Sequence, residues 1–386
     1  MTRAPLIIGV VAGEASGDLL GSHLIRTLRE HLPRARFTGI GGPRMQAAGM
    51  EVLYPLEKLA VRGYVEVLRH YFEIVGIRRR LAARFLEEPP ALFIGVDAPD
   101  FNLDLEVKLR SAGIPTAHYV SPSIWAWRGG RMGKIKRAVS RMLVVFPFEA
   151  ALYEQAGVPV TYVGHPLADL LAGFPDRAAM REQLRLPAAA KVIALLPGSR
   201  VSELEQMAGL FVETAAHIAA SVPDVRFLVP LVSRATRELF ESALYRQGGE
   251  LNVTVLFGHA HEATAAADVV LAASGTATLE AALIGRPMVI TYRMPRASWW
   301  LINNRRYQPY VGLPNILAGE FIVPEFLQEE ATPDNLSQAV LNLLFDATVR
   351  TRLEARFAAM AQELRQNSAE RMAAALLPLI RTGATP

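Results

Sequence analysis

The chain of 386 residues contains no cysteine. This absence excludes disulfide scaffolds, thiolate nucleophiles, zinc–thiolate sites and iron–sulfur clusters, because each of them needs cysteine sulfur. Long apolar runs are also missing. A membrane-spanning helix needs about 20 consecutive apolar residues, and the runs in this chain end earlier, in glycine, proline or a charged residue. The sequence therefore predicts neither a disulfide-stabilised domain nor a membrane-spanning one.

Two further patterns are absent from the sequence. The eight histidines form no H-x-x-x-H pair and no carboxylate-rich cluster, so we predict no metal site and no metal cofactor. His259 and His261 stand two residues apart and are interpreted as polar loop residues. Basic and aromatic residues do not interleave as they do in nucleic-acid-binding surfaces, so we predict no nucleic-acid partner.

What the chain does contain is apolar and basic. Hydrophobic residues make up 51%, and 41 Lys and Arg face 37 Asp and Glu; the mean hydropathy is +0.20 and the pI about 9.4. This balance suggests a membrane, but without a spanning helix it leaves either a soluble or a peripheral protein. The apolar run 6–12 resembles a secretion signal, but it is short and Gly13-Glu14 follows it, so we interpret it as a buried strand and expect a cytoplasmic protein.

Short β-branched runs alternate with longer helical patterns, which is typical of βα units around a parallel sheet. The expected strands are 6–12, 36–40, 92–96, 116–120, 142–146, 160–163, 192–196, 225–229, 253–257, 269–272 and 288–291. Polar and helical residues at 167–190 suggest a linker. We therefore predict an α/β fold with two doubly wound Rossmann-like domains, at 1–175 and 186–350, and C-terminal helices at 351–386 that pack back on the first domain.

Ligands of such sheets bind beyond the carboxyl ends of the strands, and two loops of the first domain carry polar groups there. Residues 13–18 read Gly-Glu-Ala-Ser-Gly-Asp, with Ser16 as the expected helix cap, although the loop is also consistent with a tight turn alone. Residues 97–102 read Asp-Ala-Pro-Asp-Phe-Asn. Asp97 is the candidate general base; Asp100 or Asn102 could instead cap the next helix.

Two other segments of the first domain are unusual. Ser121 begins a loop that contains Trp125 and Trp127, whose rings suit stacking on a sugar or acyl group, although they could equally pack within the loop. The segment 61–81 mixes apolar residues with arginines, as interfacial helices do, but a core helix with a basic end has the same pattern. Its candidate membrane-facing residues are Val65, Val67, Leu68, Arg69 and Tyr71.

The second domain has loops suited to an anion. Ser199 and Arg200 follow a strand and offer backbone donors, a hydroxyl and a guanidinium to a diphosphate. Ser274, Gly275 and Thr276 open a helix whose amides point at a phosphate. Glu280, one turn further on, is placed to accept hydrogen bonds from ribose hydroxyls. Asn315, after Pro314, either reads a polar ligand edge or starts a turn.

Taken together, these loops resemble those of the lipid-A-disaccharide synthase family, inverting glycosyltransferases of the GT-B class. The resemblance runs nearly end to end. It is carried by VAGEASGD at 11–18, GPRM at 42–45, DAPDFN at 97–102, HYVSPSIWAWR at 118–128, LLPGSR at 195–200, ASGT at 273–276, YRM at 292–294 and LPN at 313–315. The 97–102 and 118–128 loops are the most specific of these.

The resemblance implies a fold of two domains facing a cleft and a reaction that needs no metal. The expected donor is UDP-2,3-diacylglucosamine, the acceptor is 2,3-diacylglucosamine 1-phosphate (lipid X), and the products are a β(1→6)-linked tetraacyl disaccharide 1-phosphate and UDP. The expected location is peripheral, on the cytoplasmic face of the inner membrane. The family's catalytic aspartate falls on Asp97, its diphosphate-side arginine on Arg200 and its donor-site amide on Asn315.

The resemblance thus divides the candidates into two groups. The donor side is expected to comprise Ser199, Arg200, Ser274, Gly275, Thr276, Glu280 and Asn315. The acceptor side is expected to comprise Glu14, Ser16, Asp100, Asn102, Ser121, Trp125 and Trp127. The alternatives are another GT-B enzyme, such as a UDP-sugar epimerase or a transferase with a soluble acceptor, and a nucleotide-sugar-binding module without catalysis. Acyl-chain length, the oligomeric state and the roles of Glu14 and Asp18 stay open.

Overall fold

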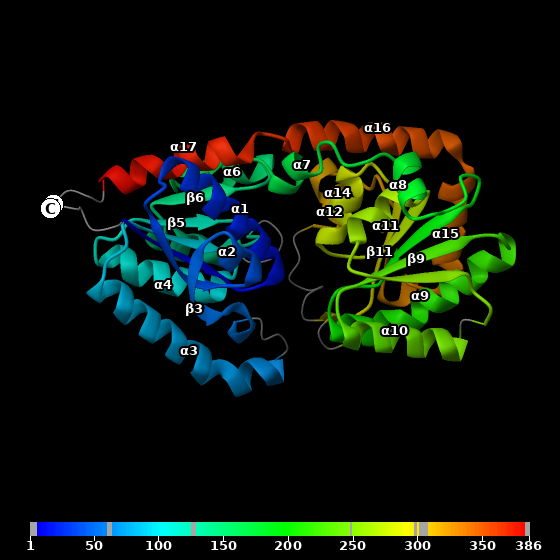
Figure 1. Ribbon diagram of the computed structural model, residues 1–386, viewed down its shortest axis with the longest axis horizontal. Helices are drawn as coiled ribbons and strands as arrows, with labels where there is room; N and C mark the ends of the chain where they lie inside the picture. Colours follow the sequence, from blue (N-terminus) through cyan, green and yellow to red (C-terminus); the bar gives the residue numbers. More distant parts are fainter. Residues whose placement is uncertain are drawn as a thin grey trace. The chain divides into compact units, whose positions relative to one another are not determined.

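The computed structural model describes residues 6–59, 64–124, 129–247, 249–296, 299–300 and 308–382. The chain divides into two compact units, which are coloured by sequence in Figure 1. Unit 1 comprises residues 1–169 and 364–386, and unit 2 comprises residues 170–363. Each unit has its own parallel sheet with helices packed around it.

Unit 1 contains a seven-stranded parallel sheet in the order β3-β2-β1-β4-β5-β6-β7. The strands are β1 (Ile7–Ala12), β2 (Arg36–Gly41), β3 (Met50–Pro55), β4 (Leu92–Val96), β5 (Thr116–Tyr119), β6 (Arg141–Val144) and β7 (Val160–Tyr162). The helices are α1 (Ala15–His31), α2 (Pro43–Ala47), α3 (Tyr64–Glu87), α4 (Pro99–Ser111), α5 (Met132–Ala138), α6 (Pro147–Gln155), α7 (Pro166–Leu170) and α17 (Ser368–Thr382).

Unit 2 contains a six-stranded parallel sheet in the order β10-β9-β8-β11-β12-β13. The strands are β8 (Val192–Leu196), β9 (Arg226–Leu231), β10 (Val253–Phe257), β11 (Val269–Ala273), β12 (Met288–Tyr292) and β13 (Glu325–Leu327). The helices are α8 (Arg177–Gln183), α9 (Val201–Ser221), α10 (Arg234–Gln247), α11 (Ala260–Ala266), α12 (Thr276–Leu283), α14 (Leu313–Ala318), α15 (Pro333–Phe345) and α16 (Ala347–Leu364).

The central strands are apolar along their whole length because helices cover both faces of a parallel sheet. All five residues of β4, of β8 and of β11 are buried. In unit 1, Phe85 of α3 meets Phe93 of β4 edge to face, with ring centroids 5.8 Å apart. Burial of these strands and of the facing helix surfaces is the main stabilising contribution to each unit.

Every expected strand overlaps an observed one, but two observed strands were not expected. β3 lies at the edge of its sheet and is only partly buried, so it lacks the continuous apolar run that marked its neighbours. β13 has three residues, too few to show a period. The expected linker at 167–190 contains α7 and α8, and residues from 170 onward belong to unit 2.

The C-terminal helices divide between the two units. α16 belongs to unit 2 as far as Glu363, and α17 packs against α1 and β6 of unit 1 (Figure 1). Residues 351–363 were expected among the C-terminal helices that pack on the first domain. They belong to unit 2 instead, because they continue the helix that begins at Ala347. Among the described residues, no helix is long and apolar enough to cross a bilayer.

Candidate functional site

Each sheet has one place where the strand order reverses. In unit 1 this switch point lies between β1 and β4, and in unit 2 between β8 and β11. In doubly wound sheets, ligands bind beyond the carboxyl ends of the strands at such a switch point. The predicted loops 13–18 and 97–102 flank the first switch point, and the loops 197–200 and 274–276 flank the second.

In unit 1 the two loops touch. A Cβ added to Gly13 would lie 2.8 Å from the Cβ of Ala98, closer than real side chains approach. Glycine is therefore required at position 13 for the first loop to pass the second. The structure thus brings Glu14, which follows Gly13, to the same edge as Asp97.

Asp97 itself has a left-handed backbone. Its φ is +51°, and that of Ala98 is +44°; two successive non-glycine residues in this region are unfavourable and are a mark of functional sites. The Asp97 N–H donates to the carbonyl of Tyr119 at 2.9 Å, and the Asp97 carbonyl accepts from Asn102 Nδ2 at 2.8 Å. Within the described residues the Asp97 carboxylate makes no hydrogen bond or ion pair, so it is available to a ligand.

The capping roles considered for Asp100 and Asn102 are wrong. α4 begins at Pro99, so both residues lie inside the helix. Asn102 is fully buried and donates to the carbonyls of Val11 and Asp97, at 3.2 and 2.8 Å. It therefore supports the Asp97 turn from behind rather than facing an acceptor. Asp100 is exposed and forms an ion pair with Arg131.

A buried pair beneath the Asp97 turn was not foreseen in the sequence. Glu106 on α4 and His118 on β5 are both fully buried, and Glu106 Oε1 lies 2.7 Å from His118 Nδ1. Burial raises the pKa of the Glu106 carboxyl, and the neighbouring imidazole acts in the opposite direction. The sequence signal was present in the His118 motif, but only the sheet register places this histidine beside α4.

The side chains of residues 14–18 have other structural roles than those expected. α1 begins at Ala15 with Glu14 at the N-cap position, so Ser16 is an exposed residue of the first turn and not a cap. Asp18 is buried and accepts hydrogen bonds from the N–H groups of Gly42, Arg44 and Met45, at 2.9–3.0 Å. The open role of Asp18 is thus structural, because its carboxylate holds the N-terminus of α2.

The loop after β5 is held by a buried hydroxyl pair. Ser121 Oγ lies 2.8 Å from the hydroxyl of Tyr153, and burial raises the pKa of that tyrosine above its usual range. Ser121 is itself buried, so it holds the start of the loop instead of presenting its hydroxyl. Trp125 and Trp127 lie outside the described residues.

At the switch point of unit 2, a glutamate occupies the turn after β8. Glu203 Oε2 accepts from the N–H groups of Ser199 and Arg200, at 3.0 and 3.2 Å, and its Oε1 lies 2.9 Å from Arg200 Nη1. Ser199 and Arg200 are both exposed. The two backbone donors expected to bind a diphosphate are thus satisfied by Glu203, and the hydroxyl and guanidinium remain the candidate ligand groups. Glu203, in the first turn of α9, was not among the expected site residues.

The second loop of this switch point opens α12 without a side-chain cap. Gly275 is the N-cap residue and Thr276 the first helical residue, and both are exposed. Ser274 does not cap the helix: its hydroxyl lies 3.3 Å from the carbonyl of Val311. Amides at the start of a helix carry partial positive charge, so this end of α12 suits an anion.

Glu280 has a partner that the sequence did not indicate. His261 Nε2 lies 3.1 Å from Glu280 Oε2, and both side chains are partly buried. The interpretation as a loop residue is wrong for His261, which lies inside α11, and is confirmed for His259, which precedes that helix as its N-cap residue.

Asn315 is buried inside α14, with all of its polar capacity engaged. Its Nδ2 donates to the carbonyl of Val323 at 2.9 Å and to Glu325 Oε1 at 2.8 Å. Its Oδ1 accepts from the N–H groups of Ile322 and Val323, at 2.8 and 3.0 Å. Glu325 in turn accepts from backbone N–H groups in the loop before α14. Asn315 therefore organises this loop from the interior.

α3 presents aromatic side chains to solvent. Tyr71 and Phe72 are 52% and 82% exposed, and their rings meet edge to face. Arg78 is engaged with Asp104 of α4 at 2.8 Å, whereas Arg79 is exposed. The side chains of Val65, Val67, Leu68 and Arg69, also on α3, lie outside the described residues.

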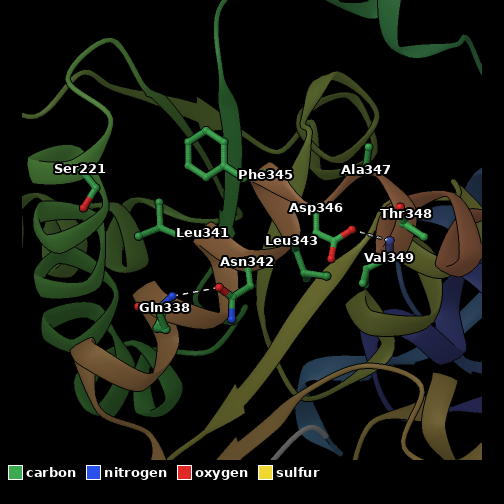
Figure 2. A pocket seen from close by; sticks show the side chains of 10 residues that line it. All are labelled: Ser221, Gln338, Leu341, Asn342, Leu343, Phe345, Asp346, Ala347, Thr348 and Val349. Atoms are coloured by element: carbon green, nitrogen blue, oxygen red, sulfur yellow. Dashed lines mark hydrogen bonds between the residues drawn. The ribbon is translucent and has the colours of Figure 1, made fainter.

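A hollow of about 860 Å³ lies elsewhere in unit 2 (Figure 2). It is lined by Ser221 at the end of α9 and by residues of the α15–α16 junction. α9 begins at the carboxyl edge of the sheet and is 21 residues long, so its far end is about 30 Å from that edge. This hollow is therefore separate from the switch point. In the described part of the chain, no three His, Asp or Glu side chains gather closely enough to hold a metal ion.

Solved structures with this architecture define the class of protein. The chain aligns over 97% of its length, and 99% of the other, with the UDP-GlcNAc 2-epimerase from Neisseria meningitidis bound to UDP-GlcNAc, at a TM-score of 0.63 and 11% identity. The calicheamicin glycosyltransferase CalG4 aligns over 100% of both chains, at 0.62 and 15%. The fold is therefore that of the GT-B glycosyltransferases.

Sequence relatives identify the family within that class. The family model of lipid-A-disaccharide synthetase matches residues 8–377. The lipid-A-disaccharide synthase of Methylobacillus flagellatus is 57% identical over 97% of this chain and 99% of its own. That of Azoarcus sp. is 57% identical over 98% and 97%. The chain belongs to the lipid-A-disaccharide synthase family and is a hexosyltransferase of lipid A biosynthesis; the alternative of another GT-B enzyme is not favoured.

Proposed function

We propose that the chain transfers 2,3-diacylglucosamine from its UDP derivative to the 6-hydroxyl of 2,3-diacylglucosamine 1-phosphate. The acceptor oxygen forms a bond to the anomeric carbon as the bond from that carbon to the UDP oxygen breaks. The hydroxyl proton passes to Asp97, and the electron pair of the broken bond leaves with UDP. Attack opposite the leaving group inverts the anomeric centre and gives a β(1→6) linkage.

The observation that carries this proposal is the position of Asp97. Its carboxylate stands at the switch point of unit 1, in a left-handed turn and without a partner among the described residues. A carboxylate held in this way is suited to accept a proton from a hydroxyl nucleophile. Glu14, Ser16 and Asp100 are the proposed acceptor-side groups around it, together with Trp125 and Trp127. Asn102 and Ser121 support the same side from buried positions.

On the donor side we assign the diphosphate to α12 and to the turn after β8. The amides of α12 near Gly275 and Thr276, with Ser199 and Arg200, would stabilise the negative charge that develops on departing UDP. Glu280 would accept hydrogen bonds from the ribose, with His261 fixing its carboxylate. Asn315 would act indirectly, by fixing Glu325 and the loop before α14.

Transfer assays with both acylated substrates test the proposed reaction. Purified protein should form the tetraacyl disaccharide and release UDP, and non-acylated analogues should be poor substrates. Asp97→Asn should lower kcat by about 10² to 10⁴, because general base catalysis supplies an effect of this size. UDP affinity, measured by calorimetry, should be unchanged. Full activity in this variant would exclude Asp97 as the base.

We also propose that α3 docks the protein on the cytoplasmic face of the inner membrane. Tyr71 and Phe72 supply exposed apolar area and Arg79 supplies positive charge, the combination that binds anionic bilayers. The double variant Tyr71→Ser/Phe72→Ser should sediment less with vesicles containing anionic lipid. Tyr245→Ser is the matched control, since Tyr245 is 92% exposed on α10 of unit 2. Equal sedimentation of the two variants would refute the docking role.

A further inference from the structure

The helix that follows Asp97 is fastened to its sheet by buried polar side chains as well as by apolar ones. Asn102 and Glu106 are four residues apart on α4, so they lie on one face of the helix, and both are fully buried. Asn102 contacts the carbonyls of Val11 on β1 and of Asp97. Glu106 contacts His118 on β5. One helical turn thus links β1, the Asp97 turn and β5.

Gly95 makes room for this arrangement. It pairs with His118 in the sheet and lies two residues before Asp97. A Cβ at position 95 would lie 2.2 Å from Glu106 Oε1 and 2.9 Å from the Cβ of Asn102. The Glu106 carboxyl group therefore occupies the space that a side chain of β4 would fill. The Glu106 carboxyl group is therefore packed directly against the backbone of β4, two residues before Asp97.

Stability alone does not account for a buried carboxyl–imidazole pair. Glu106 Oε2, His118 Nε2 and Asn102 Oδ1 are buried and have no hydrogen-bond partner within the described residues. Burying polar atoms without partners is unfavourable, and apolar residues of similar volume are often at least as stabilising as a buried ion pair. What a hydrogen bond supplies and an apolar contact does not is a fixed direction.

We propose that Glu106 and His118 are positioning residues for Asp97. Their hydrogen bond fixes the register of α4 on the sheet, and α4 fixes the left-handed turn that presents the carboxylate. The proposal rests on the assignment of Asp97 as general base. A displacement of a catalytic group by about 1 Å lowers rates by as much as about 100-fold. Loss of the Glu106–His118 hydrogen bond should therefore lower kcat and leave donor binding unchanged.

Three variants distinguish the effect of the directed Glu106–His118 hydrogen bond from the effect of the space that the two side chains fill. Glu106→Gln keeps the size and one acceptor for His118, and its kcat should stay within about threefold of the parent. Glu106→Leu removes the acceptor, and its kcat should fall about 10- to 100-fold with UDP affinity unchanged. The double variant Glu106→Leu/His118→Phe removes both polar partners and refills the space. Its thermal stability should recover toward that of the parent, while its kcat should stay low.

Several outcomes would overturn the proposal. If kcat recovers together with stability in the double variant, the pair only packs. If Glu106→Gln loses as much kcat as Glu106→Leu while both remain folded, the hydrogen bond is not what matters. Lys108→Ala is the matched control, since Lys108 is an exposed residue of the same helix, and it should leave both kcat and stability unchanged.

A final pair of variants distinguishes this proposal from the base assignment. In the Asp97→Asn background, Glu106→Leu should cause no further loss of the residual rate, because residues that act as a unit are not additive. Full activity of Asp97→Asn alone would mean that the base assignment fails. An inactive Asp97→Asn beside a folded Glu106→Leu variant with parental kcat would mean that only the positioning role fails.

Discussion

At the switch point of unit 1, β4 is followed by two left-handed residues, Asp97 and Ala98, and buried polar side chains lie behind them. At the switch point of unit 2, β8 and β11 end in glycine-containing loops with exposed hydroxyls, an exposed guanidinium and the uncapped start of α12. Both sites arise from the same reversal of strand order. They differ in what the flanking loops hold in place.

The difference matches two chemical tasks. A base must be held in one position, because proton transfer depends on distance and direction. Unit 1 fixes the Asp97 loop through hydrogen bonds that join it to β5 and α4, and α4 to β1. A diphosphate needs donors around a charge that grows during the reaction, and unit 2 leaves amides, hydroxyls and Arg200 at the surface. If the two sites have these separate tasks, a substitution at one of them should leave the function of the other unchanged.

Arg200→Ala should give a large effect and should act on the donor alone. We expect kcat/KM to fall about 10² to 10³, the usual loss when one group that stabilises developing negative charge is removed. UDP affinity should fall as well, in contrast to Asp97→Asn. Calorimetric titration with UDP checks this, with Arg234→Ala as the control, since Arg234 is an exposed residue of unit 2 paired only locally with Glu238. Unaltered UDP affinity would remove Arg200 from the donor site.

Gly13→Ala should disturb unit 1 to a smaller extent. The new Cβ would meet Ala98 at 2.8 Å, so the Asp97 turn must shift, and we expect kcat to fall about 10-fold. UDP affinity should be unchanged. Gly133→Ala provides the comparison, because Gly133 lies in α5 with no atom within 4 Å of the added Cβ. Equal kcat values for the two variants would show that the contact with Ala98 does not set the position of Asp97.

The smallest effect concerns the helices that follow β1 and β8. Burial lowers the pKa of His23 on α1 from 6.5, with Asp169 and Glu30 opposing the shift and Arg26 adding to it. The unfolded chain therefore binds more protons at this site, so stability falls as the pH drops below about 6.5 toward the lowered pKa of the folded state. His217 on α9 is exposed and serves as the counterpart.

Hydrogen exchange of α1 and α17, corrected for intrinsic rates, measures this dependence at pH 7.5 and 5.5. His23 Nε2 lies 3.5 Å from Ser368 Oγ on α17, so both helices should exchange faster at the lower pH. His23→Gln should reduce that difference, and His217→Gln should not. A pH effect that survives His23→Gln would assign it to other groups.

Most of the fold could be predicted from local pattern. Strands such as β4 and β8 are continuous apolar runs, which only a parallel sheet covered on both faces explains. Asp97 could be singled out because it directly follows β4, and Arg200 because it lies in the loop that follows β8. β3 and β13 escaped prediction because an edge strand and a three-residue strand carry little periodic signal.

The errors lie where a side chain's role depends on residues distant in sequence. Ser16 and Asn102 have capping chemistry, but their helices begin one and three residues earlier, so they do not cap. Asn315 stays a predicted donor-site residue, and the structure adds that its side-chain amide is bonded within unit 2, to residues 322–325. Asp18 holds a helix that begins 25 residues further along the chain, at Pro43.

The sequence by itself determined the fold class, the family and the strand ends that carry the chemistry, because burial patterns and motifs are local properties of the chain. Only the tertiary structure decided which polar residues face outward and which lie behind them. Glu106 and His118 meet because β5 pairs with β4 at Gly95, and Asp18 of α1 accepts from the N–H groups of Gly42, Arg44 and Met45 because β2, which precedes them, pairs with β1. Hydrogen-bond partners are set by the packing of distant elements, and no local pattern records that packing.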